Sequence, residues 1–568
     1  MPAHIAIGND SFREIRENNL EYVDKTKLIQ EILDDIGTKV LLLPRPRRFG
    51  KTVNMTMLET FLARSPEDTS HLFEGLHIWE AGDAYREHFQ RYPTLLLSFK
   101  NIKPASESEW ESILDQLLSE LFSAHTAELE LEVLAPIERQ ELQQLIDKKA
   151  NSALKQVALL KLSAWLERAH GERVLILVDE YDTPIHAAWR NQCYEPVVHF
   201  FRAFFGAALK GNPHLFKAVL TGILRVSKES IFSDLNNILV GTILDKEFSD
   251  AFGFTEAEVK ALCRRQGQLD QIQTIQTWYN GYRFGGRVMY NPWSVLNFLW
   301  RADKTPQAYW VTSSSNTLIK ELLSKHALEV HESFQTLLQG GVIQRKIEPN
   351  VVFPELTYRH DTLFTLLLFS GYLKAEQVPT GPLEEALWAL SIPNLEVRGV
   401  FQSTFQQWIE TALGGSGTHT QQLVNAMLRG DEERFEAYLS QLASRVLSYH
   451  DGAYFDPEAL YHGLMLGLCA TLEPQYRVRS NRESGKGRPD LMIQPTRAGL
   501  PGAVLELKVA NRRRTLEQAL ALGVDQLQTQ AYDAELEAMN AAPIQRWAVA
   551  FDGKTVCVER VEKVDALK

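Results

Sequence analysis

Residues 39–52 read "KVLLLPRPRRFGKT", an apolar run followed by a short basic loop that ends in Gly50-Lys51-Thr52. A helical pattern, "TVNMTMLETFLAR", follows directly, so the predicted order is strand, loop and helix. A phosphate-binding loop of the form G-x-x-x-x-G-K-[ST] has this order, but it begins with a glycine where this chain has Arg45. The stretch therefore indicates either a phosphate-binding loop with an unusual first half or a basic turn before a helix.

The surrounding sequence favours an α/β sheet around this loop. Three further apolar runs have the length of strands and alternate with longer amphipathic stretches. Continuous apolar strands between helices are typical of a parallel sheet covered on both faces. We therefore expect a doubly wound α/β domain over residues 1–255. The three runs are "TLLLSF" (94–99), "RVLILV" (173–178) and "FKAVLTG" (216–222), and the amphipathic stretches span 107–125, 152–168 and 194–210.

In such a loop each residue of the final tripeptide has a chemical role. Backbone N–H groups from Gly50 onward face the phosphates at the helix N-terminus, where the helix dipole favours anions. Lys51 is predicted to reach the β- and γ-phosphates of ATP, and the Thr52 hydroxyl is predicted to ligate Mg²⁺.

The first half of the loop lacks backbone donors that a glycine-rich loop would offer. Arg45 replaces the glycine, and Pro46 has no N–H group. We expect the guanidinium groups of Arg45, Arg47 and Arg48 to bind phosphate in place of these donors. This arrangement favours nucleotide binding over fast hydrolysis.

The second half of the predicted nucleotide site lies in "VLILVDEYD" (174–182), an apolar strand that ends in acids. The carboxyl edge of an open α/β sheet is where ligands bind. Asp179 is predicted to hold Mg²⁺ and Glu180 to activate the attacking water. The alternative is that these acids only cap the next helix.

A third candidate element, "TGILRVSKESIF" (221–232), follows the run at 216–222 and brings Arg225 near the same edge. Arg225 is interpreted either as a sensor of the γ-phosphate or as a surface arginine.

Composition limits the class of protein. The 568 residues are 45% hydrophobic and 23% charged, and the formal net charge is −12. An acidic chain is not coated for non-specific nucleic-acid binding, although one local basic groove remains compatible with it. No apolar run reaches the length of a membrane span, no secretory signal is visible, and the four cysteines are isolated. We expect reduced thiols, no membrane partner and a cytoplasmic location.

The rest of the chain divides into two parts. Residues 256–440 have a mostly helical pattern and are expected to form a lid or linker region. Within them, the aromatic insert at 278–294 predicts a packed hairpin. Residues 441–568 show a new order of helix, three strands, helix and strand, which predicts a separate α/β domain.

A second candidate site lies in "GKGRPDLMIQPTRAGLPGAVLELKVA" (485–510). Alternation along a strand puts Glu506 and Lys508 on one face, away from Leu505 and Leu507. Asp490, on the preceding strand, is expected to meet them. The two acids are predicted to ligate Mg²⁺ or Mn²⁺, and Lys508 to position or activate the attacking water. A salt bridge at the edge of a sheet is the alternative.

Several motifs together resemble the AAA-like ATPase family that bacteria fuse to a PD-(D/E)XK nuclease domain, which has the restriction-endonuclease-like α/β fold. In that family an arginine-rich loop that ends in GK[ST] is the usual form. The resemblance therefore interprets Arg45 as a family variant. The motifs are "IGNDSFREIRENNLEYVDKTKLIQEIL", "RPRRFGKT", "VDEYD", "TGILRVSKESIF", "FGFTEAEV", "YNGYRFGG", "YNPWSVLNFL", "IPNLEVR" and the Asp490, Glu506 and Lys508 signature.

The resemblance implies further residues at the nuclease site. Glu458 stands where the first helix of such nucleases gives an extra metal-side carboxylate. Gln526 and Tyr532 resemble a glutamine and a tyrosine beside the active site, although Gln528 is an alternative to Gln526. The basic run "NRRR" (511–514) is interpreted either as a phosphate contact or as a solvated turn.

The function that follows is phosphodiester cleavage by a metal-dependent nuclease controlled by ATP binding or slow hydrolysis. By analogy it would act in defence or as a regulated toxic nuclease, with DNA favoured over RNA as substrate. The alternative is an ATP-sensing regulatory protein whose nuclease fold does not cut. Association into a homo-oligomer is compatible with either function.

Overall fold

The computed structural model divides the chain into two compact units. The first contains Met1–Leu318 and Val342–Val397, and the second contains Ile319–Gly341 and Arg398–Lys568. The structure describes residues 2–129, 134–226, 237–312, 331–338, 340–351, 360–379, 381, 385–401, 418–446, 461–462, 465, 468–469, 472, 475–480, 489–511, 513–530 and 532–563.

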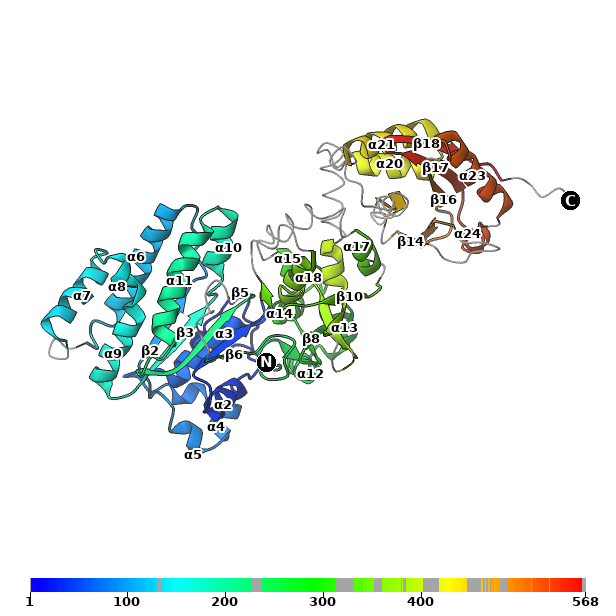
Figure 1. Cartoon of the computed structure of the whole chain (residues 1–568). Helices are drawn as coiled ribbons and strands as arrows, with labels where there is room; N and C mark the ends of the chain where they lie inside the picture. The colour runs from blue at the N-terminus through cyan, green and yellow to red at the C-terminus, as the bar shows by residue number, and fades with distance from the viewer. Residues whose placement is uncertain are drawn as a thin grey trace. The chain divides into compact units, whose positions relative to one another are not determined.

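A five-stranded parallel sheet forms the centre of the first unit (Figure 1). Its strand order is β2-β3-β4-β1-β6, so β4 lies between the strand that precedes the basic loop and the strand that ends in acids. Every residue of β1 and β3 is buried, as expected for strands covered on both faces. The doubly wound α/β fold is therefore confirmed. The strands are β1 (Val40–Pro44), β2 (Thr94–Ser98), β3 (Val174–Asp179), β4 (Leu215–Gly222) and β6 (Ile238–Val240).

The longer helices cover this sheet because they bury an apolar stripe. Helix α11, for example, turns four phenylalanines inward, and it packs on β4 while α9 packs on β3. The helices described in this part are α1 (Phe12–Glu17), α2 (Lys27–Asp34), α3 (Lys51–Leu62), α4 (His77–Glu80), α5 (Asp83–Arg86), α6 (Glu107–Ala124), α7 (Pro136–Ile146), α8 (Ser152–Gln156), α9 (Ala158–His170), α10 (Thr183–Arg190) and α11 (Tyr194–Leu209).

The rest of the first unit is less helical than its sequence pattern predicts. Two small three-stranded sheets occur there, with orders β7-β9-β8 and β10-β13-β12. The aromatic insert forms the predicted hairpin between β8 and β9, with Tyr279, Tyr282 and Tyr290 buried. The elements are β7 (Phe254–Thr255), α12 (Glu256–Arg265), α13 (Ile272–Tyr279), β8 (Tyr282–Phe284), β9 (Arg287–Tyr290), α14 (Pro292–Trp300), α15 (Tyr309–Thr312), β10 (Ile343–Lys346), α18 (His360–Phe369), β12 (Lys374–Val378) and β13 (Leu387–Ser391), together with the short pair β5 (Arg225–Val226) and β11 (Asn350–Val351).

The second unit contains a mixed five-stranded sheet of order β14-β15-β16-β17-β18, in which only β16 and β17 run parallel. Two separate cores lie on its faces. Leu505 and Leu507 pack with residues of α20 and α21, whereas Val504 packs with α23 and α24. The predicted alternation along 503–509 is thus confirmed. The elements are α17 (His331–Leu338), α20 (Thr418–Arg429), α21 (Glu432–Val446), β14 (Tyr476–Ser480), β15 (Leu491–Pro495), β16 (Gly502–Val509), α23 (Leu516–Thr529), α24 (Ala534–Ala538), β17 (Ile544–Asp552) and β18 (Thr555–Arg560).

The expected domain boundaries at 255 and 440 stay predictions, although α20 and α21 share a core with the C-terminal sheet.

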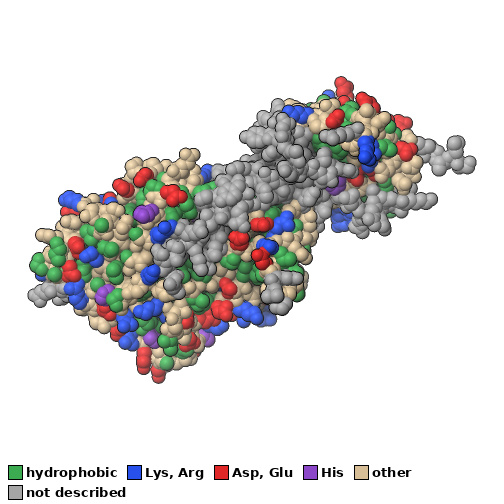
Figure 2. Space-filling view, viewed as in Figure 1, with side chains coloured by type: hydrophobic (Ala, Val, Ile, Leu, Met, Phe, Trp, Pro, Cys, Tyr) green, Lys and Arg blue, Asp and Glu red, His purple; other side chains and the backbone are tan. Residues whose placement is uncertain are grey.

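The four cysteines are free thiols, and Cys193, Cys263 and Cys469 are buried. No helix in the described ranges is long and apolar enough to cross a membrane. On the face shown in Figure 2, acidic and basic side chains are interspersed over the described surface.

Candidate nucleotide site and candidate nuclease site

In the loop between β1 and α3, the Lys51 side chain reaches back to backbone carbonyl oxygens of the same loop. Gly50, the N-cap of α3, has φ of 84°, a left-handed conformation that glycine adopts readily. The Lys51 ammonium donates to the carbonyl oxygens of Arg45 and Pro46, both at 3.2 Å. Burial lowers the pKa of Lys51, and the carboxylates of Glu180 and Asp179 oppose that shift. The ammonium group thus lies beside the helix N-terminus and near two acids.

Asp179, at the end of β3, joins this loop to the neighbouring strand. Its Oδ2 accepts a hydrogen bond from the Thr52 hydroxyl at 2.7 Å, and its Oδ1 accepts one from the Thr221 hydroxyl at 2.6 Å. Thr221 lies on β4, the strand between β1 and β3. The strand order therefore brings together two predicted magnesium-side groups, Thr52 and Asp179, that stand far apart in the sequence.

Glu180 lies at the same edge of the sheet in a strained backbone conformation, with φ of 52°. Its carboxylate accepts from the Thr183 hydroxyl at 3.2 Å, and it lines the same cavity as Lys51 and Thr52. The N-cap position of α10 belongs to Asp182. The acid at 180 thus faces the cavity, which favours the interpretation as a site residue over helix capping.

The three loop arginines have different environments. Arg45 is completely buried, and its guanidinium donates to the carbonyl oxygens of Pro44, Gly241 and Phe248. The expected phosphate contact of Arg45 is therefore wrong, because these carbonyls hold its donors inside the fold. Arg47 and Arg48 line the cavity beside Lys51, as expected of phosphate-binding groups. Arg225 lies on β5, and its side chain lies outside the described residues.

The cavity beside the loop has a volume of about 400 Å³. One wall consists of the loop and the start of α3. Ala6, Gly8 and Asn9 from the N-terminal segment and Trp293 from α14 also line the cavity. The cavity joins cationic groups to small and aromatic side chains, a combination that suits a nucleotide with charged phosphates and an apolar base.

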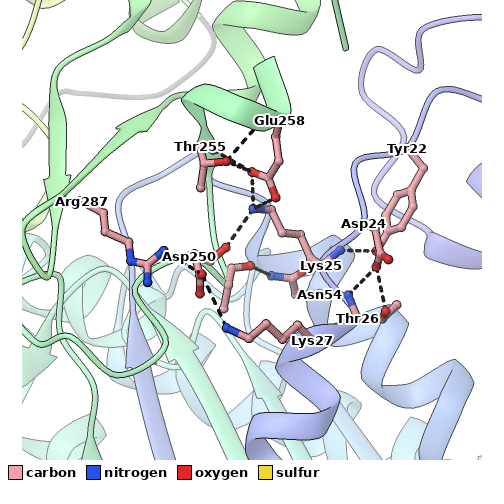
Figure 3. Close-up of polar contacts among 11 residues, drawn as sticks. Tyr22, Asp24, Lys25, Thr26, Lys27, Asn54, Asp250, Thr255, Glu258 and Arg287 are labelled. Atoms are coloured by element: carbon pink, nitrogen blue, oxygen red, sulfur yellow. Dashed lines mark hydrogen bonds and ion pairs between the residues drawn. The ribbon is translucent and has the colours of Figure 1, made fainter. Parts of the chain in front are cut away.

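The N-terminal segment is fixed in place by a polar network on Lys25 (Figure 3). The buried Lys25 ammonium donates to both carboxylate oxygens of Glu258 and to the Asp250 carbonyl, each at 2.8 Å. Glu258 also forms a capping box with Thr255 at the start of α12. Asn54 on α3 donates to the Ala251 carbonyl at 2.8 Å. The Lys25 contacts join the N-terminal part of the chain to the start of α12, and the Asn54 contact joins α3 to the segment before α12.

The second candidate site lies where β15 and β16 begin to pair. Lys508 donates to Glu506 Oε2 at 2.8 Å and lies 3.5 Å from Asp490 Oδ2. Asp490 also accepts from the Leu507 backbone N–H at 2.8 Å. The three predicted residues therefore converge on one point of the sheet.

Glu506 is the more deeply buried of the two acids at this site. Its side chain is 0% exposed, and its Oε1 has no hydrogen-bond donor among the described residues. Burial raises the pKa of Glu506 to about 7, the charge of Asp490 acts in the same direction, and Lys508 opposes it. Two carboxylates near one ammonium, with one buried oxygen lacking a donor, fit a hard divalent cation. No cluster of three or more potential ligands occurs in the described part of the chain.

Tyr532 and Gln526 lie beside these acids. The Gln526 amide donates to the Tyr532 hydroxyl at 3.4 Å, whereas Gln528 is exposed on α23. Burial and the neighbouring Glu506 charge both raise the pKa of Tyr532. Of the two glutamines, the structure therefore places Gln526 at the site. Glu458 lies outside the described residues.

Sequence reasoning missed His462, which lies against the same site. Its Nε2 is 3.0 Å from the backbone carbonyl oxygen of Asp490. The only signal in the sequence was its place on the predicted helix 456–470, which also contained several other polar residues.

Comparison with known proteins finds one family match in each unit. Residues 6–232 match the family described as a predicted AAA-ATPase, and residues 456–561 match the PD-(D/E)XK nuclease superfamily. The chain thus joins an AAA-ATPase-like domain to a domain of the PD-(D/E)XK nuclease superfamily, as its motifs indicated. It is also 27% identical over 469 residues to a protein of Azotobacter chroococcum mcd 1 described as "Uncharacterized protein in vnfD 5'region". This similarity covers 81% of the chain and 80% of the relative.

Proposed function

We propose that the protein is a metal-dependent nuclease whose phosphodiester cleavage is controlled by ATP at the N-terminal domain. The observation that carries this proposal is the convergence of Asp490, Glu506 and Lys508 on neighbouring strands of the superfamily fold. Burying a carboxylate oxygen without a hydrogen-bond donor lowers the stability of the fold, and a bound cation would offset that cost.

In this proposal Asp490 and Glu506 hold Mg²⁺ or Mn²⁺. A bound divalent cation of this kind would polarise the phosphodiester and lower the pKa of a bound water. Lys508, released from Glu506, would donate to a phosphate oxygen or orient the attacking water. Tyr532 and Gln526, on the face of the sheet that carries Glu506, would orient its carboxylate.

The N-terminal site would bind ATP with Mg²⁺. Lys51 and the backbone at Gly50 would contact phosphate oxygens, and Thr52 with Asp179 would form the magnesium side. Arg47, Arg48, Lys100 and Lys103 supply further positive charge at this cavity. Glu180 would act as the general base if ATP is hydrolysed.

DNA is the proposed substrate, with a role in defence or as a regulated toxic nuclease. Arg513 and Arg514 line a depression near the end of β16, and they offer a local basic contact for nucleic-acid phosphate. This is compatible with an acidic chain because the contact is confined to one place.

Cleavage assays on single-stranded DNA, duplex DNA and RNA test the proposal, with Mg²⁺ or Mn²⁺ and with or without ATP. We expect cleavage by the wild type, its loss in EDTA, and its loss in Asp490→Ala. Lys508→Ala should keep metal binding, measured by calorimetry, and lose most activity. Glu433→Ala and Lys554→Ala serve as controls for the loss of an acid and of a lysine, since both change exposed residues of the same unit outside the depression near the end of β16.

The outcome that contradicts this proposal is a wild type that neither binds Mg²⁺ or Mn²⁺ nor cuts any of these substrates. The ATP-sensing regulatory protein with an inactive nuclease fold would then be favoured. If the wild type binds the metal but cuts none of these substrates, the metal site is supported. The substrate or the activating condition would then be absent from the assay.

A further inference from the structure

The basic loop lacks the first glycine of the usual phosphate-binding loop, and other parts of the chain contact its first half. The Arg47 carbonyl oxygen accepts a hydrogen bond from the Trp310 indole N–H at 3.2 Å. The Arg48 guanidinium lies over the Trp293 ring, 4.2 Å from its centroid. Arg48 also has φ of 67°, which is uncommon for a residue with a side chain. Two tryptophans thus contact two consecutive residues of the loop.

One buried acid, Glu396 in the segment that follows β13, contacts both of the helices that carry these tryptophans. Its Oε1 accepts from the backbone N–H of Trp310 at 2.7 Å. The Ser294 hydroxyl lies 3.0 Å from Oε1 and 2.8 Å from Oε2 of the same carboxylate. Ser294 adjoins Trp293, whose indole N–H donates to the Tyr309 carbonyl at 3.2 Å. One carboxylate therefore ties α14 to α15.

The burial of this acid has a physical cost. Glu396 is 0% exposed, and the hydroxyl and N–H donors that the structure describes for it are neutral. Burial raises its pKa to about 7. Burying such an acid lowers the free energy of unfolding. A role in positioning other residues would explain why the fold contains it.

We propose that Glu396 and Trp310 are positioning residues of the nucleotide site, which hold the Arg47 backbone in the shape that binds phosphate. The inference rests on the proposed ATP site. Glu396 fixes the start of α15, and Trp310 carries that position to the loop through its indole N–H. The contact takes over the shaping role that glycines have in an ordinary loop of this kind.

Calorimetric affinities for ATP and AMP test the inference in four variants. Trp310→Phe keeps an aromatic ring and removes the indole N–H, and Glu396→Ala removes the carboxylate. Both should lower ATP affinity roughly three- to tenfold, the range of one lost hydrogen bond. AMP affinity should fall less, because AMP has fewer phosphates in contact with the loop. Glu396→Gln should bind ATP with an affinity close to that of the wild type, since the amide oxygen still accepts from the Trp310 backbone N–H.

Trp165→Phe is the matched control, because Trp165 is also buried in the first unit and donates its indole N–H to Glu138 at 3.1 Å. It should bind ATP like the wild type. Equal losses of ATP and AMP affinity in Trp310→Phe, or wild-type ATP affinity in that variant, would overturn the inference. If Glu396→Ala does not fold, Trp310→Phe decides the question. A wild type that binds no ATP would instead overturn the proposed nucleotide site itself.

Discussion

At the scale of single residues, the two sites depend on acids in unusual environments. Asp179 is buried and accepts hydrogen bonds from two threonine hydroxyls, whereas Glu180 has a strained backbone and lines the cavity. The proposed function gives the two acids different tasks. Asp179, bonded to Thr52, would belong to the magnesium side, and Glu180 would transfer the proton.

Glu180→Gln should lower ATP turnover by roughly 10²- to 10⁴-fold, the usual contribution of a positioned general base. ATP affinity should stay close to that of the wild type, because the amide keeps the shape of the carboxylate. Phosphate release assays and calorimetry measure the two effects. Glu172→Gln, at a surface salt bridge with Arg91, is the control. A wild type without turnover above background would make the domain a nucleotide switch without a base.

Glu396 gives a pH-dependent prediction with a defined sign. Its pKa in the fold is about 7, above the ordinary value of 4.5. Between these pH values the unfolded chain has lost this proton and the folded chain keeps it, so this group lowers stability as pH rises from about 4.5 to 7. The neighbouring Tyr279 and Tyr282 stay neutral there, because burial raises their pKa values.

Glu396→Gln removes this titration. Its thermal midpoint relative to the wild type should therefore be higher at pH 8 than at pH 5, as measured by scanning fluorimetry. Glu111→Gln, which changes an exposed acid on α6, should show no such trend. A midpoint difference that does not change with pH would contradict the assignment.

At the scale of elements, the nuclease site depends on how closely α23 approaches β16 and β17. A side chain at Gly523 would meet Ala548 Cβ at 3.2 Å and Lys508 Cγ at 3.6 Å. The absence of a side chain thus lets the helix lie directly over the strand that carries Lys508.

Gly523→Val should separate α23 from the sheet, with a cost of about 1–3 kcal/mol typical of overpacking. It should also reduce cleavage, because Lys508 lies under the new side chain. A Cβ atom added at Gly206 on α11 would have no neighbouring atom within 4 Å, so Gly206→Ala is the control. The control should leave stability unchanged or raise it by about 1 kcal/mol through helix propensity. Denaturation midpoints and cleavage rates measure both, and unchanged values in Gly523→Val would contradict this account.

At the scale of the whole molecule, the question is whether the two units act together. The chain passes from the first unit into the C-terminal part of the second at Arg398, two residues after Glu396. This connection therefore begins beside Glu396, which accepts a hydrogen bond from the Trp310 backbone N–H. The Trp310 indole N–H in turn donates to the Arg47 carbonyl oxygen of the basic loop.

Lys51→Ala should weaken ATP binding about tenfold or more, since it removes a charge-assisted phosphate contact. Added ATP should change the cleavage rate of the wild type and leave that of Lys51→Ala unchanged at the same ATP concentration. Lys260→Ala, at an exposed salt bridge on α12, should respond like the wild type. If ATP binds the wild type and its cleavage rate does not respond, the two domains work independently.

The sequence by itself determined the features that depend on local patterns. Apolar runs predicted four strands of the parallel sheet, a period of two predicted which face of 503–509 carries Glu506 and Lys508, and the insert at 278–294 predicted a hairpin. Side-chain alternation and turn chemistry act over a few residues, so a single segment contains the information.

Only the tertiary structure decided what depends on distant segments. The insertion of β4 between β1 and β3 placed Thr221 beside Asp179, and carbonyls near 241 and 248 turned Arg45 inward. The same holds for the choice of Gln526 over Gln528 and for the Glu396 contact with Trp310. These outcomes depend on strand order and packing across the chain, and a hydrogen bond between residues 86 positions apart leaves no local pattern in the sequence.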